Sequence, residues 1–172
     1  MGKKPCCVST TPSGTPVPPE PLAYAYATLI PATAITINQN PVSVVFDSVN
    51  PYPSFNIIPP SGLSSLDEFV IGSTGAYQYD YRVLARIIDP QDSPPIIFAV
   101  FVNDVEVPGS RNESDNQNLL APPTATYAVT GHGTWTFSAT DSVQLRNVGP
   151  RVQVDPTMFT AVSFRLNQVE IL

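Results

Sequence analysis

The chain has 172 residues, enough for one domain with a sizeable core and a short appendage. Only 13% of the residues are charged, and 8 basic against 14 acidic residues give a formal net charge of −6. This balance argues against a nucleic-acid partner, because phosphate binding needs a concentrated basic patch. No run of about 18 apolar residues is present, so no membrane-spanning helix is expected. The basic N-terminus is not followed by an apolar stretch, which argues against a secretory signal peptide.

Residues 1–21 are expected to form an extended connector, separate from a head domain over 22–172. Six prolines fall in this segment, mixed with Ser, Thr and Gly, and such a composition cannot bury a core by itself. The only cysteines of the chain, Cys6 and Cys7, lie here. Adjacent cysteines rarely bridge each other. The thiols are therefore either free or paired between chains, and the second case suggests a subunit that is cross-linked into an assembly.

From residue 22 onward, runs rich in Val, Ile, Thr, Tyr and Phe alternate with turn residues, a pattern typical of strands. The expected strands are 22–30, 34–38, 42–47, 52–58, 68–71, 77–88, 96–102, 105–107, 125–129, 134–139, 143–147 and 159–172. About ten or more short strands in roughly 150 residues predict an all-β sandwich, for which the jelly roll is a common large form.

Two of these segments carry expectations about packing. In 77–88, Tyr77, Tyr79 and Tyr81 share one face, and the opposite face is mostly polar. The segment 96–102 is apolar on both faces, which predicts burial on both sides. In an antiparallel protein the second buried face needs a cover, and we expect another subunit to supply it.

Turns and irregularities can also be assigned. Asn103-Asp104 predicts a two-residue hairpin turn, and residues 130–133, which include Gly131-His132-Gly133, are expected to form a turn between two strands. In the C-terminal segment the apolar alternation shifts phase by one residue, which predicts a bulge near Asn167-Gln168.

Catalytic and metal sites find little support in the sequence. A Ser-His-Asp site needs a histidine as general base, and the only candidate is His132. We expect no catalytic residue, no cofactor and no metal site, since two adjacent cysteines lack the spacing of zinc ligands. Calcium is the remaining alternative, although no EF-hand pattern is present. Its candidate ligands are the acidic and amide residues of two expected loops: Asp89, Asp92, Glu113, Asp115 and Asn116.

Four segments together resemble the tumour-necrosis-factor and complement-globular-head superfamily. They are GAYQY at 75–79, FVNDVEVPGS at 101–110, DSVQLRN at 141–147 and the closing segment 159–172. Within that superfamily they are similar to the heads of collagen-like exosporium glycoproteins and related basal-layer proteins of Bacillus spores. Asp104 and Thr140 stand where glycines are usual, and no Gly-X-Y repeat precedes the head.

This resemblance implies a jelly-roll head without catalytic activity, three copies of which pack around an axis. It suggests a structural subunit of a spore-surface layer or appendage fibre, in which trimers stack or join laterally through the cysteine-bearing connector. Self-association, and contact with other spore-surface proteins, would then take place at the spore surface. The residues expected in the trimer contact are apolar or aromatic: Tyr77, Tyr79, Tyr81, Phe98, Val100 and Phe164.

An alternative function is a receptor- or carbohydrate-binding head of a spore, phage or tailocin fibre. The alternating tyrosines, Tyr24 and Tyr26 as well as Tyr77, Tyr79 and Tyr81, could offer an aromatic face to a sugar. Cysteines in a connector favour the structural subunit, since a receptor head has no use for them.

Overall fold

The computed structural model describes residues 24–38, 41–52, 57–58, 66–88, 95–114, 125–158 and 160–171. The expected connector and its two cysteines lie outside these residues. The described part of the chain consists of strands, turns and bends without a helix, and so contains no helix that could cross a membrane. The predicted all-β fold is confirmed.

The described residues contain fourteen strands, most of them close to the expected segments. They are β1 (Tyr24–Leu29), β2 (Ile35–Ile37), β3 (Val42–Ser43), β4 (Ser48–Tyr52), β5 (Ile57–Ile58), β6 (Phe69–Ile71), β7 (Gly75–Ile87), β8 (Ile97–Val102), β9 (Val105–Glu106), β10 (Asn112–Glu113), β11 (Tyr127–Phe137), β12 (Ser142–Asn147), β13 (Val152–Val154) and β14 (Val162–Ile171).

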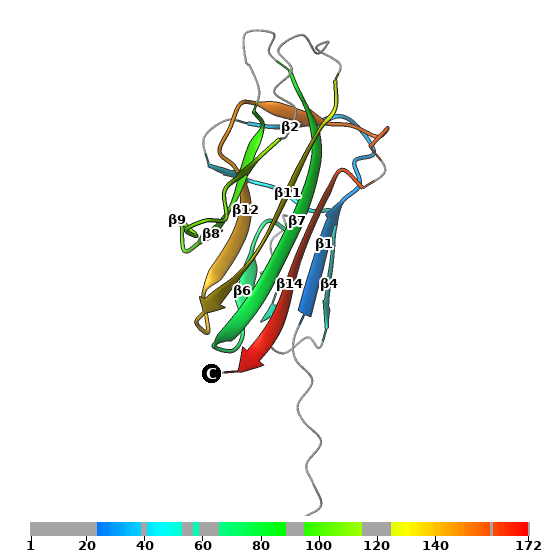
Figure 1. The fold of residues 1–172 in the computed structure, drawn as a ribbon. Helices are drawn as coiled ribbons and strands as arrows, with labels where there is room; N and C mark the ends of the chain where they lie inside the picture. The colour runs from blue at the N-terminus through cyan, green and yellow to red at the C-terminus, as the bar shows by residue number, and fades with distance from the viewer. Residues whose placement is uncertain are drawn as a thin grey trace, which may run out of the picture.

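These strands form two antiparallel sheets that pack as a jelly-roll sandwich (Figure 1). The first sheet has the order β2-β13-β7-β14-β1-β4, and β11 pairs with the other side of β7. The second sheet has the order β10-β8-β12-β6-β5, with β3 beside β12 and β9 beside β8. The long strands β7, β11 and β14 run along the length of the molecule and give the first sheet a broad outer surface.

The core lies between the sheets because each strand alternates apolar and polar side chains. Along β7 every second residue from Gly75 to Ala85 is buried, while Gln78 and Arg82 are exposed. Near the middle of the core Phe164 contacts Phe69 and Phe46, with ring centroids 5.5 and 6.4 Å apart. Edge-to-face and offset contacts of this kind stabilise aromatic clusters beyond the area they bury.

The expected hairpin and bulge are both confirmed. Asn103 and Asp104 have φ values of 48° and 67° between β8 and β9, as a two-residue turn with two left-handed positions requires. Thr140 has φ 75° in the turn before β12. Glycine adopts such values at no steric cost, whereas Asp104 and Thr140 hold a backbone conformation that residues with a Cβ seldom adopt. The pairing of β14 with β7 shifts between Gln168 and Glu170, next to the expected bulge.

The expected turn at 130–133 is wrong. These residues continue β11, which pairs with β7 without interruption from Tyr127 to Phe137. The two glycines serve packing: a Cβ on Gly131 would lie 2.3 Å from Cζ of Tyr81, and one on Gly133 would lie 2.3 Å from the hydroxyl of Tyr79. Since the tyrosine rings occupy the space of the missing side chains, the glycines mark a close cross-strand contact.

Candidate functional site

The outward-facing side chains of β1, β14, β7 and β11 make one continuous surface, here called the outer face. The strand registers align these side chains in rows that cross the four strands. The first row is Tyr24, Asn167, Gln78 and Thr134; the second is Tyr26, Arg165, Asp80 and His132; the third is Thr28, Ser163, Arg82 and Thr130. The outer face is therefore polar and ordered, with two aromatic side chains at the β1 end.

An open hollow of about 500 Å³ lies in the outer face between β1 and β14. Tyr24, Tyr26, Arg165 and Asn167 line it. The two tyrosines are 37% and 40% exposed, which is high for such large side chains. Exposed tyrosines beside an arginine and an amide are typical of surfaces that meet a partner, since the ring gives apolar contact and the hydroxyl gives hydrogen bonds.

Charges on the outer face are only partly paired within the chain. Arg165 contacts Asp80 through both carboxylate oxygens, at 3.1 and 3.2 Å. Toward the end of β7, Arg86 contacts Asp155 at 3.0 Å and donates to Gln153. The pKa of Asp155 is lowered by the hydrogen bonds from Thr157 and by the charge of Arg86. Arg82, between these two ion pairs, is exposed and makes no hydrogen bond or ion pair with the described residues.

His132 lies on the outer face as a strand residue. It is exposed and stands opposite Asp80 in the β7–β11 pairing, but Asp80 is bound to Arg165. Within the described residues no hydrogen bond joins His132 to a carboxylate, so the arrangement lacks the oriented base of a Ser-His-Asp site. The described residues also contain no cluster of three or more potential metal ligands. Of the calcium candidates, Glu113 is described; Asp89, Asp92, Asp115 and Asn116 lie outside the described residues.

The six side chains expected in a trimer contact lie inside the chain's own core. Their exposed fractions are 3% for Tyr79 and Tyr81 and 0% for Tyr77, Phe98, Val100 and Phe164. A side chain that is already buried within its own chain has no surface left to lose to a neighbour. The trimer itself remains a prediction, and exposed residues would have to make its contact.

Tyr81 shows why these tyrosines are inside. Its hydroxyl shares its one hydrogen between the carbonyl oxygens of Phe98 and Ser110, which lie 2.9 and 2.8 Å away, and accepts a hydrogen bond from Asn112. The buried phenol is thereby satisfied, and it fixes the segment that follows β9 to the core. Burial raises the pKa of Tyr81 to about 12 and also raises the pKa values of Tyr77 and Tyr79.

On the outer surface of the second sheet, an arginine of the same chain covers the largest apolar side chain of β8. Phe101 of β8 is only 6% exposed because the Arg146 guanidinium lies 4.7 Å from its ring centroid. Arg146 also donates to Gln144 and forms an ion pair with Asp104. The second apolar face of β8, for which we expected a subunit as cover, is thus covered within the chain, and that part of the prediction is wrong.

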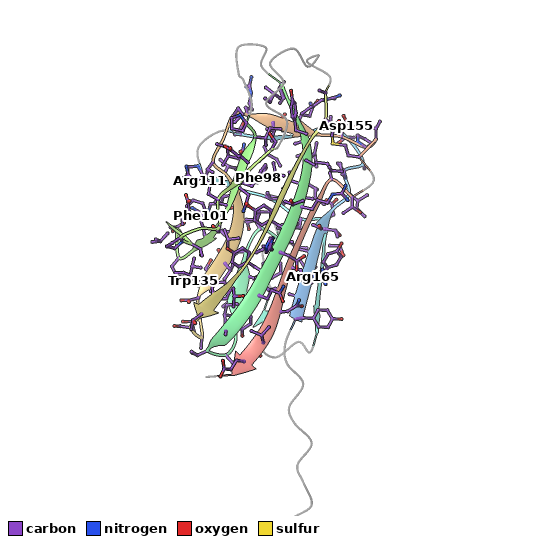
Figure 2. The ribbon with its side chains drawn as sticks, in the orientation of Figure 1. Phe98, Phe101, Arg111, Trp135, Asp155 and Arg165 are labelled. Atoms are coloured by element: carbon purple, nitrogen blue, oxygen red, sulfur yellow. The ribbon has the colours of Figure 1, made fainter. Side chains whose placement is uncertain are left out.

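The edge of the sandwich beside β11 is more exposed. This edge, formed by β9, β10 and β11, carries Val105 at 69% exposure and Trp135 at 37%. Glu113 of β10 is exposed and makes no hydrogen bond or ion pair with the described residues. Figure 2 shows Trp135 near the lower end of β11, with Arg111 higher on the same side of the molecule.

The sequence did not predict the rows of the outer face, although it did predict the polar strand face that contributes to them. The alternation in 77–88 had assigned Asp80 and Arg82 to a polar face of that strand. The register of the strands cannot be read from the sequence. It pairs Arg165 with Asp80 and places Arg82 opposite the hydroxyl-bearing residues Ser163 and Thr130.

Comparison with solved structures supports the fold. The chain is similar to Eiger TNF from S. frugiperda, with a TM-score of 0.63 and 11% identity over 88% of this chain and 95% of that one. Murine APRIL gives 0.57 and 10%, over 87% and 100%. The globular domain of zebrafish complement 1qA gives 0.56 and 9%, over 88% and 100%. The expected tumour-necrosis-factor-like jelly roll is therefore confirmed. No protein-family model and no curated sequence matches the chain.

Proposed function

We propose that the chain is a structural, non-catalytic subunit that assembles with copies of itself into homotrimers through the outer face. The observation that supports this most is the outer face itself. Four strands there present ordered polar rows, two exposed tyrosines, an open hollow and the guanidinium of Arg82, which has no partner among the described residues. On the second sheet, in contrast, the outward-facing ring of Phe101 is covered by the chain's own Arg146.

We further propose that the connector, 1–21, joins trimers into a layer or fibre at a bacterial spore surface. Cys6 and Cys7 are the only thiols of the chain and would link different copies. Prolines reduce the entropy lost when a segment docks, because their φ is already fixed. Three connectors for each trimer would act together, so weak single contacts add to a stable joint. Disulfides persist in oxidising surroundings, which places their formation late in assembly.

Self-association is tested with the full chain carrying Cys6→Ser and Cys7→Ser, so that disulfides cannot hold copies together. Sedimentation velocity at micromolar concentration should give a species three times the 18.5 kDa chain. Arg165→Glu, which places a negative charge in the hollow and beside Asp80, should shift the mixture toward monomer. Val45→Glu adds a charge at an exposed site beside β3 and serves as the control. A monomer at all concentrations would reject the proposal.

The connector is tested by non-reducing electrophoresis of the assembled protein beside a chain that starts at Glu20. The wild type should run above the monomer until a reductant is added, and the shortened chain should form trimers only. Wild type that runs as monomer without reductant would contradict the proposed role of the connector. The same holds if the shortened chain forms the same large assemblies.

The hollow also favours a second candidate function, a saccharide- or receptor-binding head. Tyr24 and Tyr26 could stack on a sugar ring while Arg165 and Asn167 bond its hydroxyl groups. A glycan array with the full chain and with Tyr26→Ala separates the two functions. Binding that is lost in Tyr26→Ala, in a protein that stays monomeric throughout, would favour the binding head. A trimer that binds no glycan would favour the structural subunit.

A further inference from the structure

A groove of about 270 Å³ lies where β1, β2 and β3 meet, and its lining residues do not belong to the rows of the outer face. Its floor is apolar and buried, with Leu29 at 1% and Ile37 at 5% exposure. Val42 and Val45 also line it and are 37% and 50% exposed. The remaining lining residues are Ile35, Thr36, Asn38, Ser43 and Asp47. An apolar floor with exposed valines beside it favours an apolar partner.

The groove also offers hydrogen-bond donors. The hydroxyls of Thr36 and Ser43 and the side-chain amide of Asn38 make no hydrogen bond with the described residues. Asp47, the acidic residue of the lining, already accepts a hydrogen bond from the backbone N–H of Ile30 at 2.7 Å. A proline-rich segment matches this set of groups, because its rings are apolar and its carbonyl oxygens need donors, while proline itself has no N–H to satisfy.

The connector contains a segment of this kind, Pro16-Val17-Pro18-Pro19. Because the φ angles of its prolines are already fixed, little entropy is lost when it docks. Charge adds to the match. The connector carries Lys3, Lys4 and Glu20, so that of the 14 acidic and 8 basic residues of the chain the head holds 13 and 6. A connector of net positive charge is attracted to a strongly acidic head.

The reach of this segment indicates that the groove it can occupy belongs to another copy. Tyr24 lies in one row with Gln78. Thr36 lies level with Arg86, eight residues further along β7, so the two levels are about 27 Å apart along the strands. Val17 precedes Tyr24 by seven residues, which span about 22 Å in a polyproline-like backbone. Val17 therefore falls short of Thr36 in its own copy.

We propose that the segment 16–19 of one copy docks in this groove of another copy. Val17 would pack against Val42 and Val45, and the polar groups of the groove would donate to the carbonyl oxygens of the segment. Because Tyr24 and β2 lie toward opposite ends of the first sheet, a connector that leaves one copy meets the β2 end of the copy placed next along the long strands. The docked connectors would join trimers end to end. This inference rests on the role proposed above for the connector and names the surface that receives it.

The first test is disulfide trapping in the Cys6→Ser, Cys7→Ser chain. A variant with Val17→Cys is mixed with a variant with Thr36→Cys and oxidised mildly, and mass spectrometry identifies the linked peptides. The mixed pair should form about fivefold more than with Val105→Cys in place of Thr36→Cys, because a disulfide needs close approach of the two residues. Val105 is a stringent control, since it is 69% exposed. A single chain with both Val17→Cys and Thr36→Cys that closes on itself would overturn docking between copies.

The second test is sedimentation of the chain with its native cysteines. Val42→Glu should reduce the material larger than a trimer about fivefold, because it sets a charge on the apolar contact, and the trimer should persist. Val17→Glu lies outside the head and should have the same effect, so a folding defect of the head cannot account for it. Val105→Glu makes the same change away from the groove and should assemble normally.

The outcomes separate this contact from the wider role of the connector. Wild type that forms large assemblies while Val42→Glu and Val17→Glu assemble equally well would overturn the groove as the docking site and leave the role of the connector intact. The same holds if the mixed disulfide forms no faster than the control. Wild type that never exceeds a trimer would overturn both.

Discussion

The outer surfaces of the two sheets differ in how far the chain completes them. On the second sheet, Arg146 covers Phe101, binds Gln144 and pairs with Asp104, so an apolar ring and a charge are satisfied together. On the first sheet the hollow beside Tyr26 is open and Arg82 has no partner among the described residues. The difference indicates that the ring of Phe101 and the charge beside it are satisfied within one copy, while the outer face of the first sheet keeps an open hollow and a charge with no partner among the described residues.

The largest expected effect is a difference in stability between substitutions on the inward and the outward side of β14. Phe164 is fully buried between Phe46 and Phe69, and its neighbour Arg165 lies on the outer face. Phe164→Ala should lower the free energy of unfolding by about 3–5 kcal/mol, because it removes a buried ring and leaves a cavity. Arg165→Ala should cost about 1 kcal/mol or less, since its exposed ion pair is screened by water, yet it should weaken self-association.

Denaturant unfolding of the two variants, at a concentration where the protein is monomeric, measures both changes. Equal losses of stability would mean that Arg165 also supports the fold, and the distinction between an inner and an outer side of β14 would fail.

A second, smaller effect concerns the inward side of β7 at high pH. The pKa of Tyr81 is about 12 in the fold and about 10 in an unfolded chain. Because the folded state holds this proton more tightly, its contribution to stability is complete below pH 10 and is lost as pH rises from about 10 to 12. The loss is about 2–3 kcal/mol at most for Tyr81, and Tyr77 and Tyr79 add to it in the same direction.

Urea unfolding at a series of pH values between about 9 and 12 measures this loss. Tyr81→Phe should be less stable at neutral pH, because the carbonyl oxygens of Phe98 and Ser110 lose their donor, but its stability should fall less steeply with pH. Wild-type stability that stays constant up to pH 12 would contradict the burial of these phenols.

The sequence predicted the fold better than the site because local patterns decide strands and turns. The alternation in β7, the two left-handed residues at Asn103-Asp104 and the phase shift in β14 each need only nearby residues to be recognised. Gly131 and Gly133 were misread as a turn, because the reason for a glycine there is a tyrosine ring on another strand. The tyrosines were assigned to a contact between subunits for a similar reason: alternation separates two faces but does not say which one is inside.

The ion pairs could not be predicted from the sequence either, because their partners come from distant strands. Arg146 and Asp104 are 42 positions apart, and Asp80 and Arg165 are 85 apart. Only the register brings either pair together, and the register depends on all the strands between them. The connector and its cysteines lie outside the described residues, so their role stays a prediction.

The smallest effect should distinguish two arginines on opposite surfaces. Arg146→Ala removes the cover of Phe101 and a partner of Gln144, and should lower the free energy of unfolding by about 1–2 kcal/mol. Arg82→Ala removes an exposed group without a partner among the described residues, and should change the stability of the monomer by about 0.5 kcal/mol or less. Thermal unfolding of the dilute protein measures both variants, and sedimentation of concentrated samples should reverse their order, with Arg82→Ala the more impaired in association. If Arg82→Ala destabilises the monomer as much as Arg146→Ala does, then both arginines make contacts within one copy, and the outer face of the first sheet is no better a candidate for a partner contact than the second sheet.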